Sequence, residues 1–437
     1  MTTPKIQSIR GMGDVLPVGQ KQFLYQSGNW VWLKRQFADW VEAHGYRYVE
    51  TPVVEELELF KRTSGETSDI VGKEMYLVRR SSTGDEAGDF SLALRPEGSA
   101  GVCRAVVEHG LARSHAGLKF YYIAPMFRSE RPQRGRYRQH TQIGIELFKE
   151  KDAAADVEVI AILSGFYQRI GLKDFVVHVN SVGDPECRPR YREVLIQFLE
   201  QFKDAMSEDA RARLYANPMR CLDSKDENDQ RLFADAPNML DHLNAECADH
   251  FAEVKAGLEK LGVPFIVDPR LVRGLDYYTK TAFEAKCNTL DGAIKTIGAG
   301  GRYDGLVEQL GGPATPGIGF GSSVERTLLA LESQQIAPPP PAPPRVLVAY
   351  MDAGVKYDAL KLAEDLRARG ISTEFLYHAK NLGRQLKEAG DLDVEYVVIY
   401  GGQEWDRGEV MLKNFRTREQ ESVRAETAAE VVAGRMK

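Results

Sequence analysis

The sequence predicts an α+β protein in two folded parts. The larger N-terminal part is built on antiparallel strands with flanking helices, and the smaller C-terminal part is an α/β domain. Six prolines within residues 338–344 cannot continue a helix or a central strand and favour an extended spacer. After this spacer, short apolar strands alternate with helices. Before it, two apolar strands, residues 119–130 and 141–150, flank an arginine-rich loop and are expected to pair antiparallel.

Composition places the chain among ordinary globular proteins and says little about its partners. The 437 residues suggest two or three domains, at roughly 150 residues each. Hydrophobic residues make up 43% and charged residues 27%, which allows a large buried core. The net charge of −6 argues against a globally basic nucleic-acid binder but leaves room for a basic surface on one face.

Targeting features and cysteine usage indicate the cytoplasm. No run of about 18 apolar residues is present, so no membrane span is expected. The N-terminal segment lacks the apolar stretch of a signal peptide. The five cysteines are scattered, with no C-x-x-C pair and no Cys/His cluster, so we expect neither a disulfide framework nor a zinc site. A reducing compartment, the cytoplasm, fits this usage best.

Hydrophobic periodicity orders the elements of the N-terminal part. An apolar stripe at helical spacing marks a buried helix over residues 154–170. Residues 185–262 are highly charged and mostly helical, and we expect them to form an insertion. The other expected elements are helices over residues 23–43 and 102–111 and strands over residues 75–80, 91–96 and 175–184.

The C-terminal segment is expected to form a small domain with a largely parallel sheet. Its first helix, over residues 355–370, places four apolar residues at helical spacing: Tyr357, Leu360, Ala363 and Leu366. The expected strands cover residues 345–350, 371–377 and 394–401, a second helix covers residues 381–390, and residues 409–415 and an alanine-rich helix follow.

The densest functional pattern is an arginine patch. Five arginines fall between Arg128 and Arg138, and Glu130 is the only acid among them. Arginine holds oxyanions through a planar fork and stacks on flat rings. A hairpin with apolar strands and an arginine-rich loop therefore places phosphate-binding groups at the rim of a buried sheet, near aromatics such as Tyr137. The alternative, a solvated loop with surface salt bridges, is weakened because one acid cannot pair five arginines.

Two glycine-rich segments fail the tests for common phosphate-binding loops. Residues 317–322 lack the third glycine of a dinucleotide fingerprint. Residues 65–74 have neither the spacing of a P-loop nor its Ser or Thr. The first segment remains a strand-to-helix turn that lets the backbone approach a ligand and carries Glu325 and Arg326 on the following helix. Its alternative is a packing turn with a surface arginine.

Two further segments carry candidate ligand-binding residues, each with a structural alternative. Residues 271–285 contain Arg273, Asp276 and two adjacent tyrosines. Because neighbours on a strand face opposite ways, one tyrosine can line a pocket while the other packs. The alternative is an Arg–Asp pair that stabilises a turn. Glu97 and Ser99, at a strand-to-helix junction, can receive a cationic ligand group, or they only cap the helix.

Together and in this order, these segments resemble the class II aminoacyl-tRNA synthetases, and specifically the histidyl-tRNA synthetase family. Residues 45–60 resemble the first class motif, with Pro52 at the turn that forms the dimer. Residues 127–139 resemble the second motif and residues 317–331 the third. The stretches that resemble segments peculiar to the histidine enzymes are residues 271–278 and 299–312.

The resemblance covers nearly the whole chain and implies its domain organisation. It implies an α+β class II synthetase catalytic core, with an antiparallel sheet and flanking helices, a helical insertion and a C-terminal α/β anticodon-binding domain. The implied boundaries are 1–184 and 263–336 for the two parts of the core, 185–262 for the insertion, 337–344 for the linker and 345–437 for the anticodon-binding domain.

The resemblance also implies an ATP site. Arg128 would hold the α-phosphate and the amino-acid carboxylate, and Glu130 would meet the adenine. Arg136 would help to hold the phosphates, with Arg326 on the γ-phosphate. Arg273 would be a further catalytic cation, aimed at the α-phosphate, where other class II enzymes rely more on a metal. Mg²⁺ is expected together with ATP, without assigned protein ligands.

A histidine pocket is implied in the same way, by Glu97, Ser99, Gln142, Glu146, Tyr277, Tyr278 and Tyr303. Glu97 and Ser99 would take the α-amino group, and the tyrosines would close around the imidazole. Gln142 and Glu146 would line one face, because a neutral amide and an acid favour a ring that donates hydrogen bonds. Ser99 stands where the family has Thr, which keeps the hydroxyl. The stretch around Thr141 differs from the commoner, aromatic-containing form.

The implied activity is that of a histidine–tRNA ligase. L-histidine and ATP would give histidyl-adenylate and pyrophosphate, and histidine would then pass to the 3′ end of tRNA(His). Arg131 and Gln133 would approach the acceptor end. A homodimer is implied, with no membrane partner. No Ser–His–Asp set is found, and the chemistry requires no protein nucleophile.

Two other protein classes share some of these features. The regulatory subunit of ATP phosphoribosyltransferase has the same core fold and senses histidine, but it usually lacks the C-terminal domain and has eroded arginine and tyrosine motifs. Residues 271–278, Arg326 and residues 345–437 are all present here, which argues against it. An RNA-binding module without enzymatic activity is the second alternative.

Overall fold

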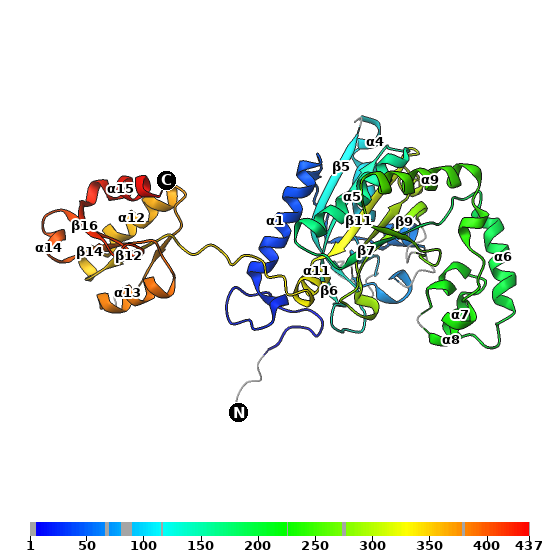
Figure 1. Cartoon of the computed structure of the whole chain (residues 1–437), viewed down its shortest axis with the longest axis horizontal. Coiled ribbons are helices and arrows are strands. Elements are labelled where there is room, and N and C mark those ends of the chain that lie inside the picture. Colours follow the sequence, from blue (N-terminus) through cyan, green and yellow to red (C-terminus); the bar gives the residue numbers. More distant parts are fainter. Residues whose placement is uncertain are drawn as a thin grey trace, which may run out of the picture. The chain divides into compact units, whose positions relative to one another are not determined.

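The computed structural model describes residues 6–65, 70–79, 90–114, 117–224, 226–272, 277–377 and 381–436. The chain divides into two compact units, Met1–Pro339 and Pro340–Lys437, and the division falls within the proline-rich segment (Figure 1). Each unit has its own hydrophobic core. Among the helices of the described segments, none combines the length and hydrophobicity that crossing a bilayer requires.

An eight-stranded sheet forms the centre of the first unit. Its strands are β1 Arg47–Tyr48, β5 Leu118–Phe127, β6 Gln139–Phe148, β7 Phe175–Ser181, β8 Phe265–Val267, β9 Thr279–Cys287, β10 Thr296–Arg302 and β11 Gly317–Ser323. The strand order is β1-β5-β6-β11-β10-β9-β7-β8. The six inner strands pair antiparallel, whereas the edge strands β1 and β8 pair parallel with their neighbours. The predicted antiparallel pairing of the two strands beside the arginine loop is confirmed.

A smaller sheet stands beside the large one. It has the order β2-β4-β3, and both pairs are antiparallel. Its strands are β2 Val54–Glu56, β3 Leu77–Val78 and β4 Leu92–Leu94, and the nearby helical elements are α2 Leu57–Ser64 and η2 Ile70–Glu74. The short η1 Phe23–Tyr25 packs against α11 Val324–Ser333 instead. The β4 strand leads directly to the start of α3, where Glu97 and Ser99 lie.

Helices cover both faces of the large sheet. On one face lie α1 Ser27–Ala43, α5 Ala153–Arg169, α9 Ala245–Lys260 and α11 Val324–Ser333, which together with the sheet enclose the largest hydrophobic core. On the other face lie α3 Ser99–Glu108, α4 Leu111–Ser114 and α10 Leu306–Gln309, around a second core. The predicted apolar stripe of α5 is buried as expected, at Val157, Ile160, Leu163, Tyr167 and Ile170.

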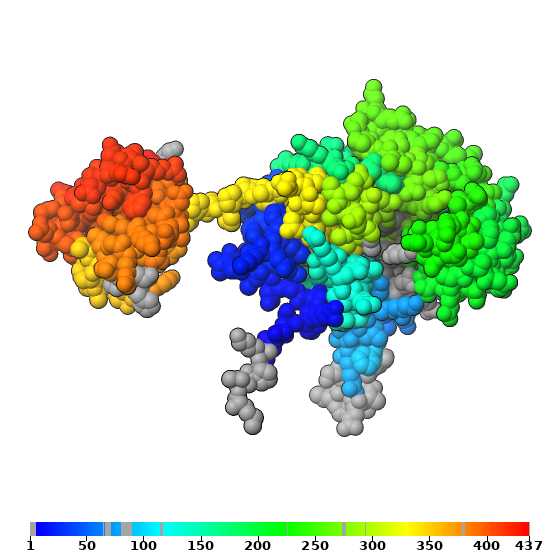
Figure 2. Space-filling view, turned by 60° about the horizontal axis from the view of Figure 1, so that its bottom comes forward, coloured from blue at the N-terminus to red at the C-terminus, as the bar shows by residue number. Residues whose placement is uncertain are grey.

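The helices that follow β7 form a lobe with a core of its own. Figure 2 shows these residues, coloured green, gathered at one side of the first unit. The elements are α6 Arg188–Glu200, α7 Glu208–Arg213, η3 Pro218–Asp223, α8 Glu227–Leu232 and η4 Met239–His242. The last helix of the predicted insertion range, α9, packs instead against α5, because Phe251, Val254 and Leu258 belong to the main core. η5 Gly292–Ile294 follows β9.

The second unit holds a five-stranded sheet in the order β13-β12-β14-β15-β16. Its strands are β12 Val346–Tyr350, β13 Thr373–Phe375, β14 Tyr396–Tyr400, β15 Glu409–Asn414 and β16 Gln420–Arg424. The first three strands in this order pair parallel, but β15 and β16 pair antiparallel. The prediction of a largely parallel sheet is therefore wrong for the last two strands. β16 escaped notice because its residues alternate between exposed and half-buried and only Val423 is apolar.

Helices cover both faces of this smaller sheet. α12 Lys356–Ala368 and α15 Ala428–Arg435 lie on one face and α13 Leu382–Asp391 on the other (Figure 1). In the predicted stripe of α12, Ala363 and Leu366 are fully buried, but Tyr357 is 75% exposed. Tyr357 lies in the first turn, where it points to solvent rather than the core. The remaining short elements are η6 Ala353–Val355, α14 Gly402–Trp405 and η7 Ala425–Thr427.

Candidate active site

A cavity of about 690 Å³ lies on the large sheet, beside the N-terminus of α3. It is lined by residues of β5, β6, β9, β10 and β11 and by the arginine loop. The sequence-predicted residues that line it are Glu97, Ser99, Arg128, Glu130, Arg136, Gln142, Tyr277, Tyr278 and Arg326. Strands and loops far apart in the sequence thus bring most of the predicted residues to one place.

The other predicted residues lie elsewhere. Glu146 and Tyr303 are buried one layer deeper, behind Ser99. Gln133 lines a separate cavity of about 630 Å³ between the arginine loop and the N-terminal segment. Arg131 is exposed on the same loop. Arg273 and the adjoining Gly274–Asp276 segment lie outside the described residues.

A buried hydrogen-bond chain stands behind the cavity. Ser99 Oγ donates to Glu146 Oε1 at 2.6 Å, and the Tyr303 hydroxyl donates to the other oxygen of the same carboxylate. Burial raises the pKa of Glu146 to about 8, although the hydrogen bonds from Ser99 and Tyr303 oppose this rise. The carboxylate thus sets the direction of two hydroxyl protons and leaves the lone pairs of Ser99 Oγ available to a ligand.

Gln142 is held in place at the cavity wall. Its side-chain oxygen accepts from the backbone N–H of Gly98 at 3.1 Å and from the Tyr122 hydroxyl at 3.2 Å. Two donors on the oxygen fix the orientation of the whole amide, because the NH₂ group must then face the other way. Tyr122 was missed in the sequence, since an apolar strand gives no sign that one of its tyrosines carries a ligand-facing hydroxyl.

Glu97 caps the helix that begins beside the cavity. Its two carboxylate oxygens accept from the backbone N–H groups of Ser99, at 2.7 Å, and Ala100, at 2.9 Å. Burial raises its pKa, and these hydrogen bonds oppose the rise. The capping alternative therefore describes the contacts of Glu97 in this structure. It does not describe Ser99, whose hydroxyl reaches Glu146 instead.

Two arginines line the cavity, one from the loop that follows β5 and one from the first turn of α11. Arg128 Nε donates to the backbone oxygen of Pro96 at 3.0 Å. Arg326, at the start of α11, donates to the backbone oxygens of Gly135 and Thr296, each at 2.9 Å. Burial and the charge of Arg128 lower the pKa of Arg326 to about 10. Two partly buried cations that repel each other favour an anionic ligand between them. Arg326 is thus partly buried and lines the cavity, which does not agree with the alternative of a surface arginine.

The arginine loop divides into inward and outward residues. Arg136 forms an ion pair with Glu130 and lies 3.8 Å from Glu74. Arg134 is exposed and pairs with Glu332 at 3.2 Å. The solvated-loop alternative therefore holds for Arg134, whereas Arg136 and Glu130 line the cavity.

The adjacent tyrosines do not face opposite ways. Tyr277 and Tyr278 both line the cavity, with ring centroids 4.6 Å apart, and the Tyr303 ring lies 5.8 Å from that of Tyr277. The expectation that one of the pair packs away from the pocket is wrong. It assumed strand geometry, but β9 begins only at Thr279, so strict alternation does not apply to the turn before it.

Several cavity residues were not singled out from the sequence. Glu284 and Lys286 project from β9, two positions apart, and Thr296 Oγ1 donates to Glu284 at 3.1 Å. Their spacing of two within an apolar strand was the available sign. His140 also lines the cavity, and burial together with the charges of Arg128 and Arg326 lowers its pKa to about 3, so its ring is neutral.

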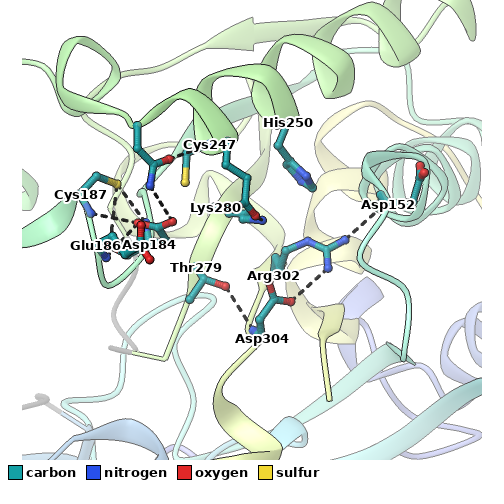
Figure 3. Close-up of polar contacts among 12 residues, drawn as sticks. Asp152, Asp184, Glu186, Cys187, Cys247, His250, Thr279, Lys280, Arg302 and Asp304 are labelled. Carbon is teal, nitrogen blue, oxygen red and sulfur yellow. Dashed lines mark hydrogen bonds and ion pairs between the residues drawn. The ribbon is translucent and has the colours of Figure 1, made fainter. Parts of the chain in front are cut away.

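A buried ion pair supports the far side of Tyr303. Arg302 is fully buried and binds the carboxylate of Asp156, also fully buried, through Nε at 3.0 Å and through Nη2. It also donates to Asp304 at 3.1 Å and to the backbone of Asp152 at 3.3 Å (Figure 3). Burial alone would raise the pKa of Asp156, but the hydrogen bond from His250 and the charge of Arg302 lower it. This cluster of buried ion pairs holds the end of β10 in place, and Tyr303 is the residue that directly follows β10.

The antiparallel sheet, the arginine-lined cavity on it and the separate α/β domain define a class II aminoacyl-tRNA synthetase. The crystal structure of apo histidyl-tRNA synthetase from S. aureus has the same fold, with a TM-score of 0.78 and 34% identity over 98% of this chain and 99% of that chain. The chain belongs to the histidyl-tRNA synthetase family, whose sequence model matches residues 24–327. The anticodon binding domain model matches residues 345–435.

Curated relatives cover nearly the whole chain. The histidine–tRNA ligase of Desulforamulus reducens is 45% identical over 95% of this chain and 96% of its own length. That of Rubrobacter xylanophilus is 46% identical over 88% of both. A Bacillus halodurans C structure described as an ATP phosphoribosyltransferase regulatory subunit/histidyl-tRNA synthetase has a TM-score of 0.60 at 21% identity and shares the fold alone.

Proposed function

We propose that this chain is a histidine–tRNA ligase that activates L-histidine with ATP and transfers it to tRNA(His). The observation that carries the proposal is the Ser99–Glu146–Tyr303 hydrogen-bond chain, which underlies a cavity bounded by the cations Arg128 and Arg326. The hydrogen-bond chain suits a small polar amino acid, and the two cations suit a triphosphate. Curated relatives with this name support the same assignment.

The histidine end of the cavity is assigned to its polar and aromatic wall. The α-ammonium group would donate to Ser99 Oγ and to Glu97, because Glu146 already receives the Ser99 proton. The imidazole would lie between the oriented amide of Gln142 and the tyrosine rings. Glu146 acts from behind, by holding Ser99 and Tyr303. A hydrogen-bonding wall rejects apolar analogues because its buried polar groups would then lose their partners.

The activation step follows from charge. A carboxylate oxygen of histidine attacks the α-phosphorus of ATP in line, the bond to the β-phosphate oxygen breaks, and pyrophosphate leaves. Negative charge builds on the phosphoryl oxygens, where Arg128 stabilises it, while Arg326 and Arg136 hold the leaving phosphates. Glu130 is assigned to the adenine. Arg273 remains a predicted catalytic cation.

A divalent cation that accompanies ATP fits the carboxylate of Glu284. This side chain lies on the cavity wall and is oriented by the Thr296 hydroxyl at 3.1 Å. Mg²⁺ is held by one or two carboxylates together with substrate phosphates, so a single oriented carboxylate is a suitable anchor. When bound, the cation would neutralise charge on the departing pyrophosphate.

The transfer step requires the acceptor end of a tRNA at the same cavity. The terminal ribose hydroxyl attacks the acyl carbon of the adenylate, and AMP leaves. Arg131 and Gln133 are assigned to the acceptor end because both are exposed on the loop that borders the cavity. The C-terminal unit is assigned to the anticodon, in line with the family model that it matches.

We also assign a homodimer to the surface around Pro52. Tyr48, Val53 and Val54 are 52%, 37% and 39% exposed there, and β1 is an edge strand of the large sheet. Exposed apolar residues beside an unprotected strand edge favour burial against a second chain. Sedimentation equilibrium that gives only the mass of one chain would contradict this assignment.

The activity is tested by histidine-dependent exchange of labelled pyrophosphate into ATP. The wild-type chain is expected to catalyse the exchange, and Arg326→Ala to lower it at least about a hundredfold, because one of the cations assigned to the ATP phosphates is lost. Arg134→Ala is the matched control, since this arginine is exposed and pairs with Glu332. A wild-type chain that binds histidine and ATP without any exchange would contradict the proposal.

A further inference from the structure

A cluster of two cysteines and an aspartate lies outside the cavity described above. Asp184, Cys187 and Cys247 each offer one ligand atom, and these three atoms all lie within 4.8 Å of one another. Both cysteines are buried, whereas Asp184 is partly exposed. Figure 3 shows the three side chains grouped together, apart from the Arg302 cluster. The two cysteines are far apart in the sequence, so the grouping exists only in the fold.

The carboxylate of this cluster is already oriented. Asp184 Oδ1 accepts from the backbone N–H groups of Glu186 and Cys187, each at 3.0 Å. Asp184 Oδ2 accepts from the side chain of Asn244, also at 3.0 Å. Carboxylates that bind metals are held by outer hydrogen bonds of this kind.

Both sulfur atoms lie at helix N-termini. Cys187 is the N-cap residue of α6, and Cys247 lies in the first turn of α9, whose N-cap is Asn244. The Asp184 N–H points to Cys187 Sγ at 3.2 Å. Helix N-termini and backbone N–H groups favour a thiolate.

We propose that Asp184, Cys187 and Cys247 form a binding site for a divalent cation that prefers thiolate ligands, of which Zn²⁺ is the type. Zinc binds sulfur at about 2.3 Å and carboxylate oxygen at roughly 2.0–2.2 Å, which places tetrahedral donors roughly 3.5–4 Å apart. The 4.8 Å limit that encloses the three donors agrees with this spacing. Two thiol protons leave on binding. The fourth position falls to water, since Asp184 is partly exposed.

A cation bound at this site would link the two ends of the helical lobe. Asp184 follows β7, Cys187 begins the first helix of the lobe, and Cys247 lies where the chain returns to the main core. Asp223 and Gln230, from the far part of the lobe, line the cavity of about 690 Å³. A cation that ties the two ends of the lobe together therefore limits its movement over that cavity.

One nearby cation offsets the charge of the loaded site. Two thiolates and a carboxylate exceed the charge of a divalent ion by one. Lys280, on β9, lies beside Cys247 and pairs with the exposed Glu246 at 2.6 Å (Figure 3). The Lys280 side chain is 13% exposed, whereas that of Glu246 is 74% exposed, so water screens the charge of Glu246 more strongly than that of Lys280.

The test is a titration of the reduced, metal-free full-length chain with Co²⁺, followed by Zn²⁺. Cobalt bound by two thiolates shows near-ultraviolet charge-transfer absorption, which is expected to saturate at one equivalent and to disappear when Zn²⁺ displaces the cobalt. Cys187→Ser and Cys247→Ser are each expected to abolish this absorption. Cys221→Ser is the matched control, since this cysteine is fully buried within the same lobe but lies outside the cluster.

Two outcomes would overturn the proposal. One is the absence of charge-transfer absorption from a wild-type chain that is fully reduced and folded by circular dichroism. The other is absorption that persists in the folded Asp184→Asn, Cys187→Ser and Cys247→Ser chains. If a serine variant does not fold, the wild-type titration still decides. In the first case, a Cys187–Cys247 disulfide isolated from the chain before reduction would indicate a redox pair instead.

Discussion

The carboxylate of Glu146 occupies the space that a β carbon on Gly319 would take. The two residues are directly paired across β6 and β11, and a β carbon on Gly319 would lie well under 3.0 Å from Glu146 Oε2 and from the backbone oxygen of Ile145. A β carbon on Gly321, which is paired with Gly144, would likewise lie under 3.0 Å from the side chain of Gln142. The glycine-rich strand is thus shaped to admit the side chains of the proposed histidine pocket.

Gly319→Ala is expected to damage the pocket more than the fold. The new methyl group meets a carboxylate and a backbone oxygen that cannot both move, so overpacking of about 1–3 kcal/mol is expected. The Michaelis constant for histidine in pyrophosphate exchange should rise at least tenfold, with a smaller change for ATP. Gly117→Ala is the control, because a β carbon there would meet nothing within 4 Å. Equal effects of both variants on histidine would refute this account of the strand.

The pH dependence of stability should report Glu146. Its folded-state pKa is raised from 4.5 to about 8 by burial, so between these values the folded chain keeps a proton that the unfolded chain releases. The free energy of unfolding therefore includes a favourable contribution from protonated Glu146 at low pH, and this contribution is lost as pH rises towards about 8. Glu146→Gln removes this loss. Urea unfolding should therefore show the variant gaining on wild type as pH rises, by an amount on the order of a few kcal/mol.

A pH-independent difference between these two chains would contradict the raised pKa of Glu146. Glu325, whose pKa burial raises to about 7, is present in both chains, so its contribution cancels in the comparison. The same variant should weaken histidine binding above about pH 8, where Glu146 is ionised and accepts both hydroxyl protons, which an amide cannot do.

The buried Arg302–Asp156 pair should be a strong determinant of stability. Asp156→Asn removes the fully buried partner of the Arg302 guanidinium and leaves only the partly exposed Asp304 as its counter-charge, and a loss of about 3–5 kcal/mol is expected. Urea denaturation measures it. The control is Glu58→Gln, which breaks an exposed pair with Arg62 and should change stability by less than about 1 kcal/mol. A loss below about 1 kcal/mol for Asp156→Asn would contradict the buried geometry.

Removal of residues 340–437 should separate the two halves of the proposed reaction. The first unit has its own core and contains the whole cavity, so residues 1–339 are expected to retain pyrophosphate exchange within about threefold of the full chain. Transfer of histidine to tRNA should fall at least about a hundredfold, because the proposed anticodon contacts are lost. If the shortened chain transfers histidine to tRNA as fast as the full chain, the C-terminal unit is not needed for tRNA recognition.

Much of the fold could be predicted from local patterns. The stripe of α5 and the antiparallel β5–β6 pair follow from hydrophobic periodicity, and both are present. β16 could not be found in this way, because an edge strand with one apolar residue has no periodic pattern. The return of α9 to the main core is likewise a property of the packed molecule, since its apolar face would suit either core.

The sequence predicted the types of residue in the site better than it predicted their arrangement in space. Arginines and acids can be recognised from their chemistry, but the position of Glu146 behind Ser99 depends on a glycine in the neighbouring strand. The Asp184–Cys187–Cys247 cluster was missed for a similar reason. Sequence spacing indicated no metal site, whereas the fold brings two helix N-termini together. Arg273 lies outside the described residues, so its role stays a prediction.

The most direct test of the account is ATP-dependent attachment of labelled amino acids to tRNA by the full-length chain. Each of the common amino acids is supplied in turn, with total tRNA as acceptor. The account predicts attachment of histidine, abolished when ATP is left out, and attachment of every other amino acid at least about a thousandfold slower. Failure to attach histidine, or preferential attachment of another amino acid, would contradict it.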